Sequence, residues 1–119
     1  MRNRQHAYLL DILNSAEAIA NTFPVMIWSN FLSDARTQDA VLRRLLVIGE
    51  AAAQLTPETK ALFGELPFRK IVGMRNRIVH DYGQIDFEIV WETVQLHLPL
   101  VRTELKAWIE CSSGSGTVL

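Results

Sequence analysis

Arginine, histidine and tyrosine side chains gather in one short stretch, residues 74–82 (Met-Arg-Asn-Arg-Ile-Val-His-Asp-Tyr). An arginine can stabilise the negative charge of a phosphate, and a histidine can move a proton near neutral pH. Cleavage of RNA by its own 2′-hydroxyl needs both functions, and it needs no metal ion. Arg75 and His80 are therefore the candidate catalytic pair of this stretch.

Helical spacing indicates which of these side chains would lie on the same face of a helix. Asn76 and His80 are four residues apart, so they share a helix face and Asn76 can hydrogen-bond the imidazole. Arg75 and Tyr82 are seven apart and also share a side. Arg75 and His80 are five apart and diverge by about 140° around the helix axis. A second copy of the helix closes that gap better than one long arginine, so we predict a homodimer, the commonest oligomer, with two of each residue around one cleft.

The same residues also have simpler interpretations. An arginine and a histidine on an exposed helix are more often solvated surface, and Tyr82 is more often half-buried with its hydroxyl at the surface. A local basic cluster suits phosphate contacts, although such clusters are common; its members are Arg69, Lys70, Arg75 and Arg77. His6 and His97 have no such neighbours in the sequence and carry little weight.

Composition narrows the class of protein. The 119 residues suit one domain, and 49% of them are hydrophobic, which is enough for a core. The net charge of −1 excludes a strongly basic nucleic-acid coat, so RNA has to bind through a local cluster. One cysteine, Cys111, cannot form an internal disulfide. There is no zinc-type Cys/His spacing, Gly-rich phosphate loop, signal peptide or membrane-length apolar run. We expect a cytoplasmic protein without a metal or cofactor.

Apolar residues recur every three or four positions, which predicts helices. They cover about residues 4–22, 34–55, 67–81 and 86–110, with short helical segments at about 25–31 and 57–64. The predicted fold is an all-α, up-and-down bundle of four main helices plus one or two short ones. Residues 1–111 form the helical domain, and residues 112–119 form a flexible C-terminal tail.

Local signals mark where these helices begin and end. Ser33 or Asp34, Thr56 and Asp86 suit helix starts, because their side-chain oxygens can accept from the first free N–H groups. Pro24 is expected to end the first helix and Gly83 the fourth, whereas Pro99 should kink the last one.

Two residues need tertiary partners. Glu50 lies beside an apolar, alanine-rich helix surface, where a carboxylate is expected to pair with an arginine from elsewhere. Gly73 disfavours the helix that contains it; it either allows close approach of another helix or has no special role. The broad apolar surface of residues 34–55 predicts packing against more than one neighbour.

The stretch 75–82 matches the pattern arginine, four residues, histidine, one residue, tyrosine. In this it resembles the HepT-like toxins of the HEPN superfamily. Further stretches resemble that family in the same order along the chain: Thr37-Gln-Asp-Ala-Val-Leu-Arg-Arg, Ile48-Gly-Glu-Ala-Ala, Pro67-Phe-Arg-Lys-Ile-Val-Gly-Met and Asp86-Phe-Glu-Ile-Val-Trp-Glu-Thr-Val. The resemblance covers roughly residues 4–110.

The resemblance implies a HEPN-like α-helical dimer that acts as an RNase, the toxin of a prokaryotic type VII toxin–antitoxin pair. Arg75 and His80 would be the catalytic residues, supported by Asn76. We also predict Arg77 and Asp81 as supporting residues of the site. The implied partners are RNA, a second copy of the chain and an MNT-type nucleotidyltransferase antitoxin, with neither DNA nor a membrane.

The resemblance also implies regulation through Tyr82. The antitoxin would transfer AMP from ATP onto the tyrosine hydroxyl. The added phosphodiester can pair with Arg75 or Arg77, and the adenosine would occupy the place of the RNA backbone. Two alternatives stay open at this point. The chain could be a non-catalytic nucleotide-binding companion of a nucleotidyltransferase, or its motif surface could only bind the antitoxin.

Overall fold

A computed structural model of the chain describes residues 2–22 and 27–115, with side chains for residues 4–21, 27–81 and 83–111. The described residues form helices and no strands. The long ones are α1 (Arg2–Thr22), α3 (Ala35–Ala53), α5 (Phe68–His80) and the continuous run of α6 (Phe87–Glu92), η2 (Thr93–His97) and α7 (Leu98–Ser115). The short ones are α2 (Trp28–Ser33), α4 (Pro57–Ala61) and the 3₁₀ turn η1 (Tyr82–Gln84). The predicted all-α bundle of four main helices is confirmed.

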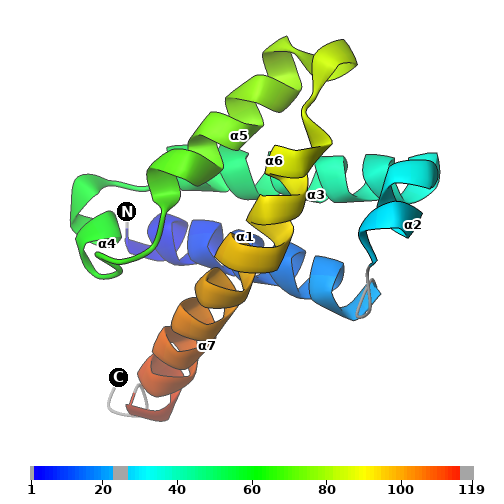
Figure 1. Cartoon of the computed structure of the whole chain (residues 1–119). Helices are drawn as coiled ribbons and strands as arrows, with labels where there is room; N and C mark the ends of the chain where they lie inside the picture. The colour runs from blue at the N-terminus through cyan, green and yellow to red at the C-terminus, as the bar shows by residue number, and fades with distance from the viewer. Residues whose placement is uncertain (1, 23–26, 116–119) are drawn as a thin grey trace.

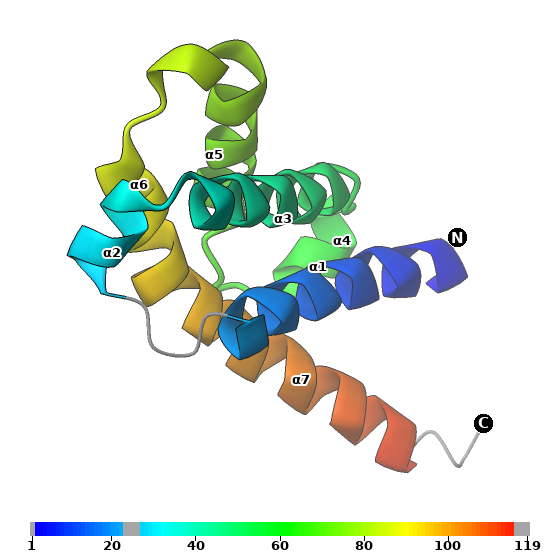
Figure 2. The same ribbon diagram turned by 90° about the vertical axis from the view of Figure 1, so that its right-hand side faces the viewer.

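Helix α3 lies at the centre of the arrangement (Figures 1 and 2). It runs antiparallel to α1 on one side and packs against α5 on the other. The chain then turns back at η1, and the run from α6 to α7 descends and crosses α1. The broad apolar surface of α3 therefore covers several neighbours, as its sequence predicts.

The core draws on all four long helices. Ile12 of α1, Ile48 of α3, Ile78 of α5 and Leu105 of α7 are each at most 1% exposed. Burial of one such side chain stabilises the folded chain by about 1.5–3 kcal/mol relative to leaving it exposed. Phe31 of α2 is also buried, and it closes the core within an aromatic cluster with Trp28, Phe87 and Trp91.

The predicted helix starts are confirmed, and each rests on atoms within three residues. Asp34 caps α3: its Oδ1 accepts from the N–H of Thr37 at 3.2 Å, and its Oδ2 accepts from the Thr37 hydroxyl at 2.7 Å. These bonds, the hydroxyl bond above all, hold the pKa of Asp34 below its usual range. Thr56 caps α4 by accepting from the N–H of Thr59, and Asp86 caps α6.

Helix ends agree less well with the sequence. α1 ends at Thr22, but Pro24 lies outside the described residues. α5 ends at His80, before the predicted Gly83 stop. The Asp81 N–H donates to the Arg77 carbonyl at 2.8 Å, and the chain then enters the 3₁₀ turn. Among the described residues no glycine has a positive φ, so Gly83 does not act as a left-handed cap.

The last helical run is irregular just before Pro99, where a kink was predicted, and it extends further toward the C-terminus than predicted. Pro99 has no N–H to donate to the carbonyl of Gln95, and the residues before it, Thr93–His97, widen into a π turn. α7 also continues to Ser115, so the first part of the predicted tail is helical. In the described ranges no helix has the length and apolar character that crossing a lipid bilayer requires.

Candidate active site

Arg75 lies in the middle of α5 and reaches toward α3. Its Nε and Nη2 donate to one carboxylate oxygen of Glu50, Oε2, at 3.1 and 2.9 Å. Its Nη1 donates to the Asn76 Oδ1 at 2.8 Å. The side chain of Arg75 is 29% exposed and that of Glu50 is 56% exposed. The arginine partner predicted for Glu50 is therefore confirmed, and it is the candidate catalytic arginine.

Gly49 explains how α5 comes this close to α3. A Cβ atom added to Gly49 would overlap the Cβ of Arg75 and would lie 2.8 Å from its Cγ. Only a glycine permits this approach. Of the two interpretations of Gly73, close approach of another helix is wrong, because a Cβ added there would meet nothing within 4 Å. The sequence signal that could have indicated Gly49 is its place between Ile48 and Glu50, inside the apolar stripe of α3.

His80 is the last residue of α5, and its side chain is exposed. Within the described part of the chain its imidazole has no hydrogen bond and no ion pair, so the predicted bond from Asn76 is not formed. The physical reason is competition. The Oδ1 of Asn76 instead accepts from the guanidinium of Arg75, and a bond to a charged donor is stronger than a neutral one.

The other predicted residues surround the end of α5. Arg77 and Asp81 are both exposed. Tyr82 begins η1 after the helix has ended, so the helical spacing that was to place it on the side of Arg75 does not apply. The reason is that helical geometry stops at His80 and Asp81 leaves the helical conformation, with φ −124° and ψ 35°. The side chain of Tyr82 lies outside the described residues.

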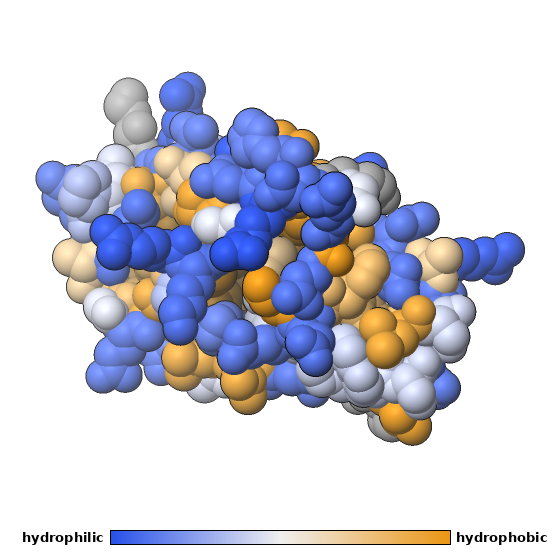
Figure 3. All heavy atoms as spheres, turned by 45° about the horizontal axis from the view of Figure 1, so that its top comes forward, coloured by the Kyte–Doolittle hydropathy of each residue, from blue (hydrophilic) through white to orange (hydrophobic). Residues whose placement is uncertain are grey.

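The surface around the site is mixed in character. Hydrophilic side chains cover much of the face that Figure 3 turns toward the viewer, with apolar groups between them. Arg69 and Lys70 are exposed at the start of α5. An open groove of about 420 Å³ between α1 and α3 reaches Glu50, with Tyr8 and Val47 in its lining. The carboxylate that anchors Arg75 therefore lines an open groove.

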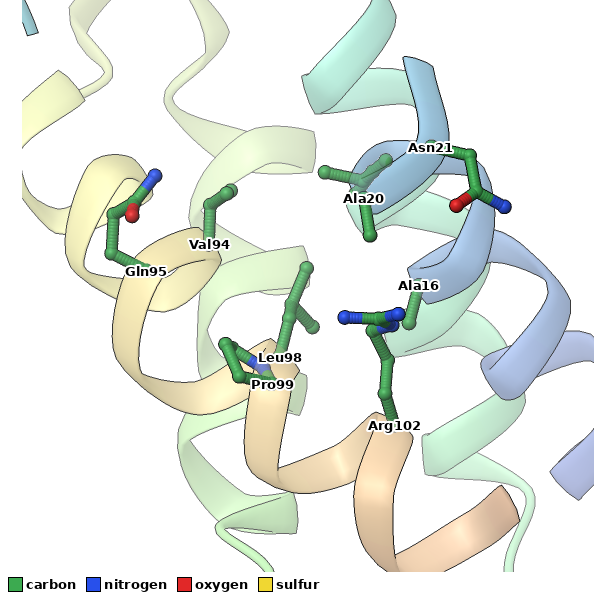
Figure 4. A pocket seen from close by; sticks show the side chains of 9 residues that line it. Ala16, Ala20, Asn21, Val94, Gln95, Leu98, Pro99 and Arg102 are labelled. Atoms are coloured by element: carbon green, nitrogen blue, oxygen red, sulfur yellow. The ribbon is translucent and has the colours of Figure 1, made fainter. Parts of the chain in front are cut away.

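A second hollow, of about 240 Å³, lies elsewhere, between the C-terminal half of α1 and the π turn (Figure 4). Arg102 reaches across it toward α1, where its Nε lies 3.7 Å from the Glu17 carboxylate. None of the described side chains of residues 74–81 lines this hollow. It is therefore separate from the candidate active site.

One chain thus offers a guanidinium held on one side and an exposed imidazole five residues further along the same helix. Five residues correspond to a divergence of about 140°, so the two groups leave α5 in different directions. Among the described residues, no three His, Cys, Asp or Glu side chains are placed to hold a metal ion. The groups that the site does offer are a cation for phosphate and a proton carrier.

Comparison with known proteins shows which family the chain belongs to. Residues 12–108 match the family described as Ribonuclease HepT-like. The chain belongs to the HepT-like ribonuclease family. It is 33% identical to the "Probable ribonuclease HepT" of Thermococcus cleftensis over 102 residues, 86% of this chain and 93% of that protein. It is 32% identical over 104 residues to a protein of Methanocaldococcus jannaschii named as a candidate RNase, covering 87% and 90% of the two chains.

The HepT-like match includes all of α3 and α5, and therefore every residue of the site from Gly49 to Tyr82. The resemblance inferred from the motif is confirmed by this match. A comparison with solved structures found none that matches the chain.

Proposed function

We propose that this HepT-like protein is an endoribonuclease that uses Arg75 and His80 and no metal ion. The observation that carries the proposal is the arrangement on α5. Arg75 is held at the surface by Glu50 and Asn76, and His80 stands exposed at the helix end. Both residues lie within the part of the chain that matches a ribonuclease family.

The proposed reaction is attack by the ribose 2′-oxygen on the neighbouring phosphorus. A base takes the proton of the 2′-hydroxyl as the O2′–P bond forms. An acid gives a proton to the 5′-oxygen as the P–O5′ bond breaks. The products are a 2′,3′-cyclic phosphate and a 5′-hydroxyl. The guanidinium of Arg75 stabilises the charge that develops on the phosphate oxygens, and His80 carries the protons.

A two-fold dimer supplies the groups that one chain lacks. Each α5 carries one histidine, whereas the reaction needs a base and an acid on opposite sides of the phosphorus. Two copies of α5 face to face bring two imidazoles and two guanidiniums to one cleft. Val79, an apolar residue 48% exposed beside His80, is consistent with a surface that a second chain covers.

In the cell the protein is proposed to act in the cytoplasm as the toxin of a type VII pair. Its MNT-type nucleotidyltransferase antitoxin would silence it at Tyr82. The tyrosine oxygen attacks the α-phosphorus of ATP, pyrophosphate leaves, and the hydroxyl proton is released. Tyr82 follows His80 by two residues, so the AMP would bring a negative charge and a bulky base to the end of α5.

The test of catalysis is RNA cleavage by purified His80→Ala protein. We expect the rate to fall by about 10²- to 10⁴-fold, the usual contribution of a general acid or base. The melting temperature should not change, because His80 is exposed and has no side-chain partner among the described residues. His6→Ala, which removes a histidine outside α5, is the control. Cleavage by His80→Ala at the wild-type rate would remove His80 from the mechanism.

Two further measurements test the chemistry and the regulation. EDTA should leave cleavage unchanged, and strong inhibition would indicate a metal-dependent reaction.

Incubation with the antitoxin and ATP should add one or more AMP masses to the wild type and to Tyr8→Phe, and none to Tyr82→Phe. Unchanged addition to Tyr82→Phe would place the acceptor elsewhere. A wild-type protein that binds the antitoxin but cuts no RNA would favour a binding role.

A further inference from the structure

The guanidinium of Arg75 has five N–H donors in a fixed planar fork. Glu50 accepts from Nε and Nη2, which form one side edge of that plane. Asn76 accepts from Nη1. Three donors are thus engaged, and two remain, one on Nη1 and one on Nη2. Nη1 and Nη2 form the outer end of the group, and each keeps one N–H that can donate to a phosphate oxygen.

We infer that Glu50 is a positioning residue for the nuclease reaction, acting by holding one edge of Arg75 so that the outer end faces the RNA phosphate. This inference rests on the proposed function. A free arginine side chain samples many rotamers, and fixing it before RNA binds removes that ordering cost from the reaction. An arginine anchored on one edge is oriented before it meets its substrate.

The environment of the pair favours positioning over stability as its role. Both side chains are partly exposed, at 29% and 56%, and ion pairs with such exposure contribute little to folding. Neighbouring residues of α3 also act on the same side chain. Gly49 lets α5 approach, and Glu50, the next residue, takes the guanidinium that this approach brings within reach.

The kinetic test compares Glu50→Ala and Glu50→Gln with wild type. We expect kcat to fall about 100-fold in Glu50→Ala, the effect of misplacing a reacting group by about 1 Å, with little change in KM. The kcat of Glu50→Gln should lie between those of the wild type and Glu50→Ala, because the glutamine amide oxygen still accepts from Nε and Nη2 but carries no charge. Glu104→Ala, which removes an exposed carboxylate of α7, is the matched control and should retain wild-type kcat. Thermal unfolding should be unchanged in all three.

A second readout needs no RNA. The side-chain Nε–Hε signal of Arg75 in a ¹⁵N NMR spectrum can be assigned by its loss in Arg75→Lys. We expect this proton to exchange slowly with water in the wild type, because Nε donates to Glu50, and to exchange fast in Glu50→Ala. Glu104→Ala should leave it slow.

The two readouts together decide the inference. If the Arg75 Hε proton still exchanges slowly with water in Glu50→Ala, the inference is overturned, because the position of the Arg75 side chain then does not depend on Glu50. Fast exchange with unchanged kcat also overturns it, and so does faster cleavage, which would mean that Glu50 competes with RNA for Arg75. A wild type that cuts no RNA overturns the proposed function and the role of Glu50 in the reaction. Loss of the slow Hε in Glu50→Ala would in that case still show that Glu50 anchors Arg75.

Discussion

Replacing Gly49 with alanine tests whether α3 and α5 meet as closely as the structure shows. The new Cβ would overlap the Cβ of Arg75 and would stand 2.8 Å from its Cγ and 3.4 Å from its Cα. The atoms it meets lie at the backbone end of the Arg75 side chain, so a rotation of the distal guanidinium cannot remove the overlap. The two helix backbones have to move apart.

Two effects of opposite sign set the magnitude. Alanine is favoured over glycine inside a helix by about 1 kcal/mol. Overpacking a well-filled contact costs about 1–3 kcal/mol, and an overlap at the backbone end belongs in the upper part of that range. We therefore expect Gly49→Ala to lower the free energy of unfolding by about 1–2 kcal/mol, from the difference of these two terms.

Gly73→Ala is the matched control, because Gly73 lies inside α5 and its added Cβ meets nothing within 4 Å. The same substitution there should raise the free energy of unfolding by about 1 kcal/mol. The measurement is urea unfolding followed by far-ultraviolet circular dichroism, at one fixed chain concentration because a dimer's stability depends on concentration. A Gly49→Ala protein as stable as Gly73→Ala would refute the close approach.

Three other predictions concern the fold. The pKa of Asp34 is lowered in the folded chain, so its contribution is present above the unfolded pKa and is lost as pH falls through the folded one. Between about pH 5 and pH 2 the urea midpoint should therefore fall less in Asp34→Asn, which still caps but cannot titrate, than in wild type; equal falls would contradict this. Thr56→Ala should cost about 1 kcal/mol in the same unfolding assay through loss of the α4 cap, and no loss would show that the cap is dispensable. Phe31→Ala should cost about 3–5 kcal/mol, because this 1%-exposed ring leaves a cavity among aromatic neighbours, and a loss under about 1 kcal/mol would mean that the site collapses to fill it.

Local rules were enough for most of the helices. The caps at Asp34, Thr56 and Asp86 could be predicted because each is satisfied by atoms within three residues along the chain. The period of apolar residues likewise located the four long helices, and the broad apolar surface of α3 indicated that it packs against more than one neighbour. The end of α5 was predicted less well, because the helix stops at His80 without a left-handed glycine, so the helical spacing used for Tyr82 does not extend to that residue.

At the candidate site the sequence indicated the residue types and one of the two residues of an ion pair. A carboxylate at position 50 on an apolar surface indicated an arginine partner, but nothing local says which arginine, 25 residues away, would meet it. Asn76 shows the same limit, because spacing allowed a bond to His80 whereas the folded chain gives its oxygen to Arg75.

The sequence by itself therefore determined the helices, their starts and the chemical groups on α5, since these depend on neighbours one helical turn away. Only the tertiary structure decided that Gly49, and not Gly73, is where two helices touch, and that Glu50 receives Arg75. The physical reason is that the crossing of α3 and α5 is set by the packing of the whole core. Which surface atoms meet at that crossing depends on its distance and angle, and no short stretch of sequence contains either.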